Sequence, residues 1–202
     1  QNIKQIIKQE YIKCAKDPVY FMKKYCWIQH PTRGRVQFNL YPFQEGTLNL
    51  LQKNDRNIIL KSRQLGISTL SAGISLWMMV FQKDKSILVV ATKQDTAKNL
   101  VTKVKFMYDN LPSWLQMGFV EKNKLALRLK NGSQIKAVSA ASDAGRSEAI
   151  SLLIIDEAAF IEENRIEDIW ASSQQTLSTG GRAIVLSTPN GTGNFFHRMW
   201  VK

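Results

Sequence analysis

The run from Leu152 to Glu157 constrains this chain more than any other segment, because it joins four aliphatic residues directly to two carboxylates. Four aliphatic residues in a row are typical of a strand buried on both faces, as in a parallel sheet covered by helices. Asp156 and Glu157 then fall where the strand leaves the core, and open α/β sheets bind ligands at that edge. In nucleotide hydrolases an Asp here holds Mg²⁺ and the next Glu activates water. The alternative is a buried strand that ends in two solvated acids.

The remaining pattern alternates strands with helices. The elements predicted after residue 56 are a strand over 57–60, a helix over 69–82, a strand over 86–91, a helix over 94–110, a hairpin of 125–129 and 134–139, the strand that ends at the acids, a helix over 166–177 and a strand over 183–186. This order predicts an α/β fold with a mostly parallel sheet flanked by helices. Upstream, we expect helices over 3–15, 18–26 and 42–52, with a loop over 28–39.

The charge balance predicts an anionic partner. The 202 residues include 28 Lys and Arg against 16 Asp and Glu, a formal net charge of +12. Nucleic acid is the commonest partner of so basic a protein. A membrane is not expected, because the charge is spread along the chain and the longest apolar run, 72–81, is too short to cross a bilayer. The N-terminus does not resemble a secretory signal. Cys14 and Cys26 fit no zinc-binding spacing, so we expect buried free thiols.

The loop after the first core strand has the setting of a phosphate-binding loop. Its sequence is Lys61-Ser62-Arg63-Gln64-Leu65-Gly66-Ile67-Ser68-Thr69. A strand, a tight turn and a helix N-terminus together offer free N–H groups to an anion. Against the pattern G-x-x-x-x-G-K-[ST], Gly66 and Ser68 match, whereas Lys61 replaces the first Gly and Ile67 replaces the Lys.

The missing lysine leaves the cation of this loop open. Phosphoryl transfer requires a positive charge near the β and γ phosphates, and either Lys61 or Arg63 is placed to supply it. Ser68 would put its hydroxyl on Mg²⁺ opposite Asp156. The alternative is that both basic residues are solvated and that Gly66 only permits a turn.

Three segments carry a family resemblance. They are Lys-Ser-Arg-Gln-Leu-Gly-Ile-Ser at 61–68, Leu-Leu-Ile-Ile-Asp-Glu-Ala-Ala-Phe at 152–160 and Leu-Ser-Thr-Pro-Asn-Gly at 186–191. Over about residues 40–200 the chain resembles the ATPase domain of the viral terminase large subunit, the DNA-packaging motor of tailed phages and herpesviruses. Some members are similar in shifting the basic residue of the loop towards its start, which favours Lys61.

The resemblance implies a P-loop NTPase fold of the ASCE type, with an N-terminal helical extension over 1–40 and the ATPase domain over 41–202. It implies Mg²⁺-dependent ATP hydrolysis that powers translocation of double-stranded viral DNA into a procapsid. Glu157 would polarise the attacking water, Asp156 and Ser68 would hold the metal, and residues 61–69 would bind the nucleotide. A nuclease domain is expected in the whole protein but not in this chain, which has no Asp or Glu after Asp168.

Other positions take roles from the same resemblance. Tyr41 and Gln44 lie where the family recognises adenine, although a packing aromatic at a helix start is an equal alternative. Arg146, within Ala-Gly-Arg-Ser at 144–147, lies near an arginine that acts on the ATP of a neighbouring subunit; a surface arginine is the alternative. The coupling motif corresponds to Ser187, Thr188 and Asn190, where Pro-Asn-Gly also makes a good turn.

The implied partners are double-stranded DNA, a portal protein and a small terminase subunit, with a homo-oligomeric ring on the procapsid and possible monomers of the isolated domain. The implied location is the host cell cytoplasm, at the procapsid portal. Five basic residues around the predicted hairpin form either a DNA-facing patch or a solvated edge: Lys122, Lys124, Arg128, Lys130 and Lys136. Two other functions stay open, a helicase-like DNA translocase and an inactive P-loop module that binds nucleic acid.

Overall fold

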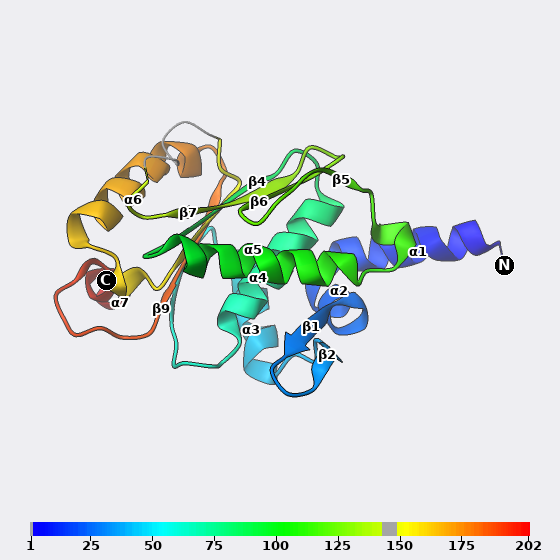
Figure 1. Ribbon diagram of the computed structural model, residues 1–202, viewed down its shortest axis with the longest axis horizontal. Helices are drawn as coiled ribbons and strands as arrows, with labels where there is room; N and C mark the ends of the chain where they lie inside the picture. The colour runs from blue at the N-terminus through cyan, green and yellow to red at the C-terminus, as the bar shows by residue number, and fades with distance from the viewer. Residues whose placement is uncertain (1, 143–148) are drawn as a thin grey trace.

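A seven-stranded sheet forms the centre of the chain, as a computed structural model shows (Figure 1). The structure describes residues 2–142 and 149–202, except for the side chains of 175 and 176. The strands, in their order across the sheet, are β3 (Arg56–Leu60), β9 (Arg182–Ser187), β8 (Leu152–Asp156), β4 (Ser86–Ala91), β7 (Gln134–Ser139), β6 (Ala126–Leu129) and β5 (Phe119–Lys122). Strands β3 to β7 in this order are parallel, and β6 and β5 join them antiparallel. The predicted α/β class with a mostly parallel sheet is therefore confirmed.

The strand order decides where the functional segments meet. Strand β9 lies between β3 and β8, so the loop after β3 and the acids at the end of β8 share one edge of the sheet, one strand apart. The register is continuous across the centre, where Val89 pairs with Ile154 and Ile154 pairs with Ile184.

Helices cover both faces of the sheet and divide the core in two. One face is covered by α2 (Pro18–Tyr25), α3 (Pro42–Lys53), α4 (Ile67–Phe81) and α5 (Gln94–Asp109). The other is covered by α6 (Glu163–Ser178) and α7 (Phe195–Val201). Alternate strand residues supply the two cores: Ile154 packs in the first, whereas Leu153 and Ile155 pack in the second. This two-sided burial explains why the strands read as continuous aliphatic runs.

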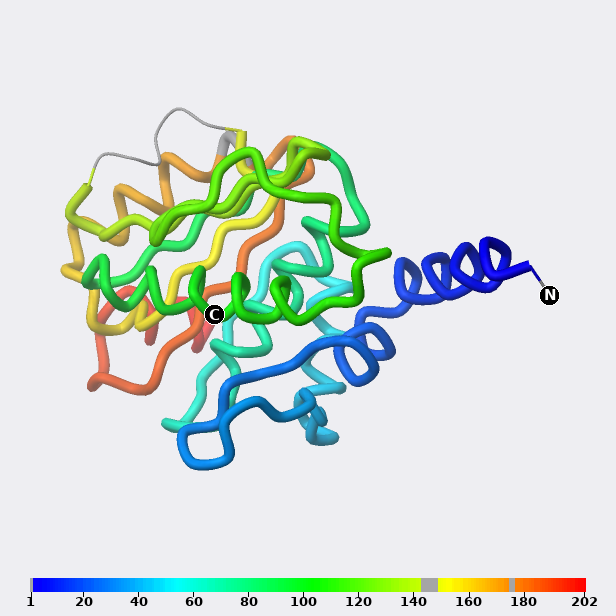
Figure 2. The backbone as a smooth tube through the Cα atoms, turned by 45° about the vertical axis from the view of Figure 1, so that its right-hand side comes forward, coloured from blue at the N-terminus to red at the C-terminus, as the bar shows by residue number. Residues whose placement is uncertain are grey.

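Helix α1 (Ile3–Lys16) projects away from the sheet and carries the N-terminus (Figures 1 and 2). Cys14 and Cys26 are free and buried, as predicted. Among the described residues, no helix has the length and apolar character needed to cross a bilayer.

The prediction of a loop over residues 28–39 was wrong. These residues form an antiparallel hairpin of β1 (Trp27–His30) and β2 (Gly34–Gln37), and β1 packs against α5. Pro31 and Gly34 read as loop signals, but Pro31 lies in the short turn and Gly34, with a φ of 67°, is the first residue of β2. Packing against α5 stabilises a hairpin too short to be stable by itself.

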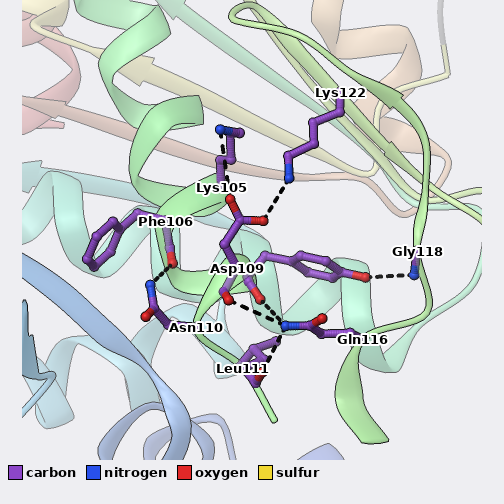
Figure 3. A network of polar contacts seen from close by, with 9 residues as sticks. Lys105, Phe106, Asp109, Asn110, Leu111, Gln116, Gly118 and Lys122 are labelled. Carbon is purple, nitrogen blue, oxygen red and sulfur yellow. Dashed lines mark hydrogen bonds and ion pairs between the residues drawn. The ribbon is translucent and has the colours of Figure 1, made fainter. Parts of the chain in front are cut away.

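The end of α5 is fixed to the segment that leads into β5, as Figure 3 shows. Asp109 accepts a hydrogen bond from Lys122 at 2.9 Å and pairs with Lys105 at 3.8 Å. The amide of Gln116 donates to the carbonyl of Leu111 at 2.8 Å, and the hydroxyl of Tyr108 accepts from the N–H of Gly118 at 2.9 Å. These contacts hold α5 in position along the sheet. The 3₁₀ turn Ser113–Leu115 and strand β5, which complete this connection, were not predicted.

Candidate active site

The loop between β3 and α4 turns sharply at the carboxyl edge of the sheet. The N–H of Lys61 still donates to the carbonyl of Ser187 on β9, at 3.0 Å, and α4 begins six residues later at Ile67. Gln64 and Gly66 both adopt left-handed backbone conformations, with φ of 63° and 70°. A Cβ on Gly66 would lie 2.8 Å from the amide nitrogen of Gln44, so a larger residue would force that side chain to move and would strain the left-handed backbone. The first N–H groups of α4 have no partner within the helix and therefore face the loop as donors.

The two candidate cations of the loop differ in their surroundings. Lys61 is half-buried, whereas Arg63 is exposed. Ile67, at the position of the usual lysine, is 4% exposed and belongs to the core below α4. The side chain at this position therefore packs inwards, and the loop offers Lys61 as its less solvated cation.

Ser68 and Asp156 are in direct contact. The hydroxyl of Ser68, in the first turn of α4, donates to Oδ2 of Asp156 at 2.9 Å. Asp156 ends β8, is only 6% exposed, and accepts the N–H of Glu157 on its other oxygen at 2.9 Å. The loop and the acidic strand, which are 88 positions apart in sequence, thus form one site.

Glu157 is held in a strained conformation beside this pair. Its φ of 55° and ψ of 38° place it in the left-handed region, which costs a non-glycine residue about 1–3 kcal/mol. The hydroxyl of Thr92, just after β4, donates to Oε2 of Glu157 at 3.3 Å. Glu157 thus follows the strand in a left-handed conformation, and its carboxylate has a hydroxyl partner.

The end of β9 is bonded to the residues that follow Glu157. The buried hydroxyl of Ser187 accepts the N–H of Ala159 at 3.1 Å. The amide of Asn190 donates to the carbonyl of the same Ala159 at 2.9 Å. Ala159 lies in the 3₁₀ turn Ala158–Phe160, and Thr188 is half-buried between its two neighbours. Two of the predicted coupling residues, Ser187 and Asn190, thus contact the segment that follows Glu157.

Tyr41 and Gln44 lie at the start of α3, against the loop. Gln44 is buried; its amide nitrogen donates to the carbonyl of Leu65 at 3.0 Å, and its oxygen accepts the N–H of Tyr41 at 3.0 Å. Tyr41 is exposed and stacks on Phe43, with ring centroids 5.8 Å apart. Gln44 therefore connects α3 to the loop, and Tyr41 presents an aromatic ring beside it.

The unit of β4 and α5 contributes two residues that the sequence did not indicate. One is Thr92, the partner of Glu157. The other is Lys103, whose pKa is lowered by burial and by the positive charge of Lys61, and raised in part by the negative charge of Asp156. Lys103 therefore lies close enough to Lys61 and to Asp156 for both charges to affect its pKa. The signal that could have indicated Thr92 is the strand order. Because β4 pairs with β8, the residue after β4 must lie beside the end of β8.

Arg146 and the basic residues near the hairpin are the other predicted site residues. Arg146 falls outside the described residues. Of the basic residues near the hairpin, Lys124, Arg128 and Lys130 are exposed, whereas Lys122 pairs with Asp109. In the described part of the chain, His, Cys, Asp and Glu form no group of three or more that could hold a metal.

Comparisons with known proteins agree with this geometry. The family model "Terminase large subunit, T4likevirus-type, N-terminal" matches residues 58–202. The large terminase of bacteriophage HK97 superposes with a TM-score of 0.75 at 21% identity, covering 93% of this chain and 40% of that one. The large terminase ATPase domain of Thermus phage P74-26 gives 0.66 at 21% identity, covering 81% of this chain and 70% of that domain.

A helicase shares the fold as well. The UvsW helicase of bacteriophage T4 superposes with a TM-score of 0.61 at 13% identity, covering 92% of this chain and 64% of the helicase. At these identities the structural matches show a P-loop type fold and no more. The family model is more specific, since it matches most of the chain, from the middle of β3 to the end of α7. This chain therefore belongs to the terminase large subunit family, in its T4likevirus-type N-terminal region.

Proposed function

We propose that this chain is the motor domain of a terminase large subunit, which hydrolyses ATP with Mg²⁺ to drive double-stranded viral DNA into a procapsid. The observation that carries the proposal is the 2.9 Å contact between the hydroxyl of Ser68 and the carboxylate of Asp156. This contact joins the candidate phosphate-binding loop to the acidic end of β8, and Glu157 is the residue directly after Asp156. Family membership supports the same activity.

The nucleotide would occupy the loop and the start of α4. Residues 61–69 would surround the phosphates, with backbone N–H groups as donors and Lys61, rather than the exposed Arg63, as the loop cation. The ring of Tyr41 offers a stacking surface for adenine. Gln44 would read the base while it stays joined to the loop through Leu65.

The oxygens of Ser68 and Asp156 fit Mg²⁺. This ion prefers oxygen ligands, keeps several waters and is usually bound through one or two carboxylates plus phosphate oxygens. The site offers one hydroxyl and one carboxylate in contact, and no larger acidic cluster among the described residues. When bound, the ion would neutralise charge on the phosphates.

Glu157 is the proposed general base. Its carboxylate would orient the attacking water and accept its proton, while the hydroxyl of Thr92 fixes the direction of that carboxylate. Ser187 and Asn190 hold Ala159, two residues further on. We infer that a shift of Glu157 on loss of the γ phosphate would move this turn and the end of β9 together, with Thr188 between them.

The partners of the whole protein follow from the family and the charge. The excess of 12 positive charges suits double-stranded DNA. A homo-oligomeric ring would allow Arg146 to act on the ATP of a neighbouring subunit, and portal protein and small terminase subunit complete the proposed assembly in the host cell cytoplasm. This chain covers 40% of the HK97 large terminase, and we propose that residues 41–202 are its ATPase domain and 1–40 an extension.

Phosphate release from ATP tests the proposal. We expect release that requires Mg²⁺ and that falls about 10²–10⁴-fold in Glu157→Gln. Binding of ATP, followed by calorimetry, should persist, because the change removes the base and leaves the loop intact. Glu162→Gln is the matched control, since Glu162 is an exposed acid five residues further along the chain.

Near-normal hydrolysis by Glu157→Gln would reject Glu157 as the base. A wild-type chain that binds DNA but releases no phosphate, with or without DNA, would favour the inactive module. The fold shared with a helicase favours a helicase-like translocase as the second candidate. Unwinding of a tailed duplex would support that candidate, whereas ATP hydrolysis without strand separation would support the packaging motor.

A further inference from the structure

Lys103 lies in the middle of α5, on the side of the helix that faces the candidate active site. Helix α5 packs along α4, the helix that opens with Ser68 (Figure 1). Lys103 and Thr69 line the same cleft, which has a volume of about 570 Å³ and lies between α5, the start of α4 and the β1–β2 hairpin. Ile28 and Pro31 form the hairpin side of this cleft. Lys103 therefore shares a cleft with the first turn of α4 and is close enough to Asp156 and Lys61 to feel both charges.

The position of Lys103 is fixed by contacts at both ends of its helix. Figure 3 shows the hydrogen bonds that attach the end of α5 to the segment before β5. At the other end, α5 follows directly from β4 and Thr92, which bonds to Glu157. Helix α5 is thus tied to the end of β8, and its middle packs beside α4, where Thr69 lines the same cleft as Lys103.

The charge of Lys103 has no partner within the described residues. Two other lysines of α5 have carboxylates nearby: Lys98 pairs with Asp95 at 3.7 Å and Lys105 with Asp109 at 3.8 Å. Lys103 makes no hydrogen bond or ion pair in the part of the chain that the structure describes. Burial and Lys61 lower its pKa, and the distant attraction of Asp156 offsets this only in part. A partly buried ammonium group without a counter-ion is unfavourable, and a bound anion would relieve it.

We propose that the ammonium group of Lys103 contacts the phosphates of the bound nucleotide and replaces the loop lysine that is missing at Ile67. This inference rests on the proposed function and adds a residue that the loop sequence does not contain. Lys61 would approach the phosphates from the start of the loop and Lys103 from α5. Two cations supplied by separate elements would match the charge of a triphosphate better than that of a monophosphate.

The test compares nucleotide affinities of the chain with and without this charge. Lys103→Met keeps the length of the side chain and removes an unpaired charge, so folding should be unaffected or slightly stabilised. With Mg²⁺ present, we expect Lys103→Met to weaken binding of a non-hydrolysable ATP analogue by roughly tenfold to hundredfold in calorimetry. Binding of AMP should change much less. Lys103→Arg should restore part of the loss.

Lys105→Met is the matched control, because Lys105 is on the same helix and points to Asp109 (Figure 3). It should bind the analogue like the wild type. Unchanged affinity in Lys103→Met would overturn the role of Lys103 and leave the proposed function intact, as would an equal loss for the analogue and AMP. Failure of the wild type itself to bind the analogue would overturn both. If Lys103→Met did not fold, wild-type affinity in a folded Lys103→Gln would overturn the role.

Discussion

Two polar clusters of this molecule are built in opposite ways. The first connects α1 to α2, where Glu10 accepts hydrogen bonds from the hydroxyls of Tyr20 and Tyr25 at 2.6 and 2.8 Å and from Lys24 at 2.7 Å. These donors, Lys24 first, lower the pKa of Glu10 to about 2. The charge on Glu10 is therefore fully compensated within the chain.

The second cluster lies at the carboxyl edge of the sheet. Glu157 has a strained backbone and the hydroxyl of Thr92 as its side-chain partner, at 3.3 Å. Lys103 has a lowered pKa and, among the described residues, no counter-ion. Charges left uncompensated in a cleft are typical of sites that complete themselves with a ligand. We therefore expect the first cluster to stabilise the fold and the second to bind a ligand. Substitutions in the first should lower stability, and substitutions in the second should lower activity.

The largest expected effect is that of Asp156→Asn. The variant removes the charge that would hold Mg²⁺, so we expect Mg²⁺-dependent phosphate release to fall at least about a hundredfold. The melting temperature should stay the same or rise, because a buried charge is removed. Asp168→Asn, at an exposed position on α6, is the control. A large drop in melting temperature with normal hydrolysis would show that Asp156 stabilises the fold and does not take part in hydrolysis.

A smaller effect is expected from Lys61→Ala. Loss of one charged contact to phosphate should reduce kcat/KM for ATP by about tenfold or more. Arg63→Ala should have a weaker effect, since Arg63 is exposed whereas Lys61 is half-buried. Steady-state kinetics of both variants make the comparison. Full activity in both would exclude the loop as a source of the phosphate-binding cation.

The smallest effect on turnover is expected from Glu10→Gln. The change removes charged hydrogen bonds, which should lower the free energy of unfolding by about 1–2 kcal/mol and the melting temperature by about 2–6 °C. Hydrolysis per folded molecule should be unchanged. Because the pKa of Glu10 is lowered from 4.5 to about 2, its stabilisation is complete above pH 4.5 and is lost as the pH falls towards 2. Thermal melts from pH 6 to pH 2.5 should show this loss in the wild type and not in Glu10→Gln.

Much of the fold and of the candidate site could be predicted from the sequence, because the buried strands have clear aliphatic patterns. The run 152–155 and the loop 61–69 have patterns set by burial on both faces and by phosphate geometry, and the structure places their polar ends in contact. The hairpin over 27–37 was missed because its strands are polar on one side and depend on α5 for packing.

Thr92 and Lys103 escaped prediction for a similar reason. Neither belongs to a motif, and each gains its place only from the tertiary arrangement. Thr92 follows β4, which pairs with β8, and Lys103 lines a cleft together with Thr69 of α4. The sequence periodicity of α5 identified a helix, but it did not show which of the helix's lysines would have no counter-ion among the described residues. Spacing in the sequence alone does not show which side chains of separate elements come together in the fold.

A crystal structure of the chain with a non-hydrolysable ATP analogue and Mg²⁺ tests the central claim most directly. We predict that the phosphates lie in the loop 61–69, that the metal is about 2.0–2.1 Å from the hydroxyl oxygen of Ser68, and that Asp156 binds it directly or through one water. Glu157 should face the terminal phosphate. A triphosphate bound elsewhere, with Ser68 and Asp156 still bonded only to each other, would contradict the account.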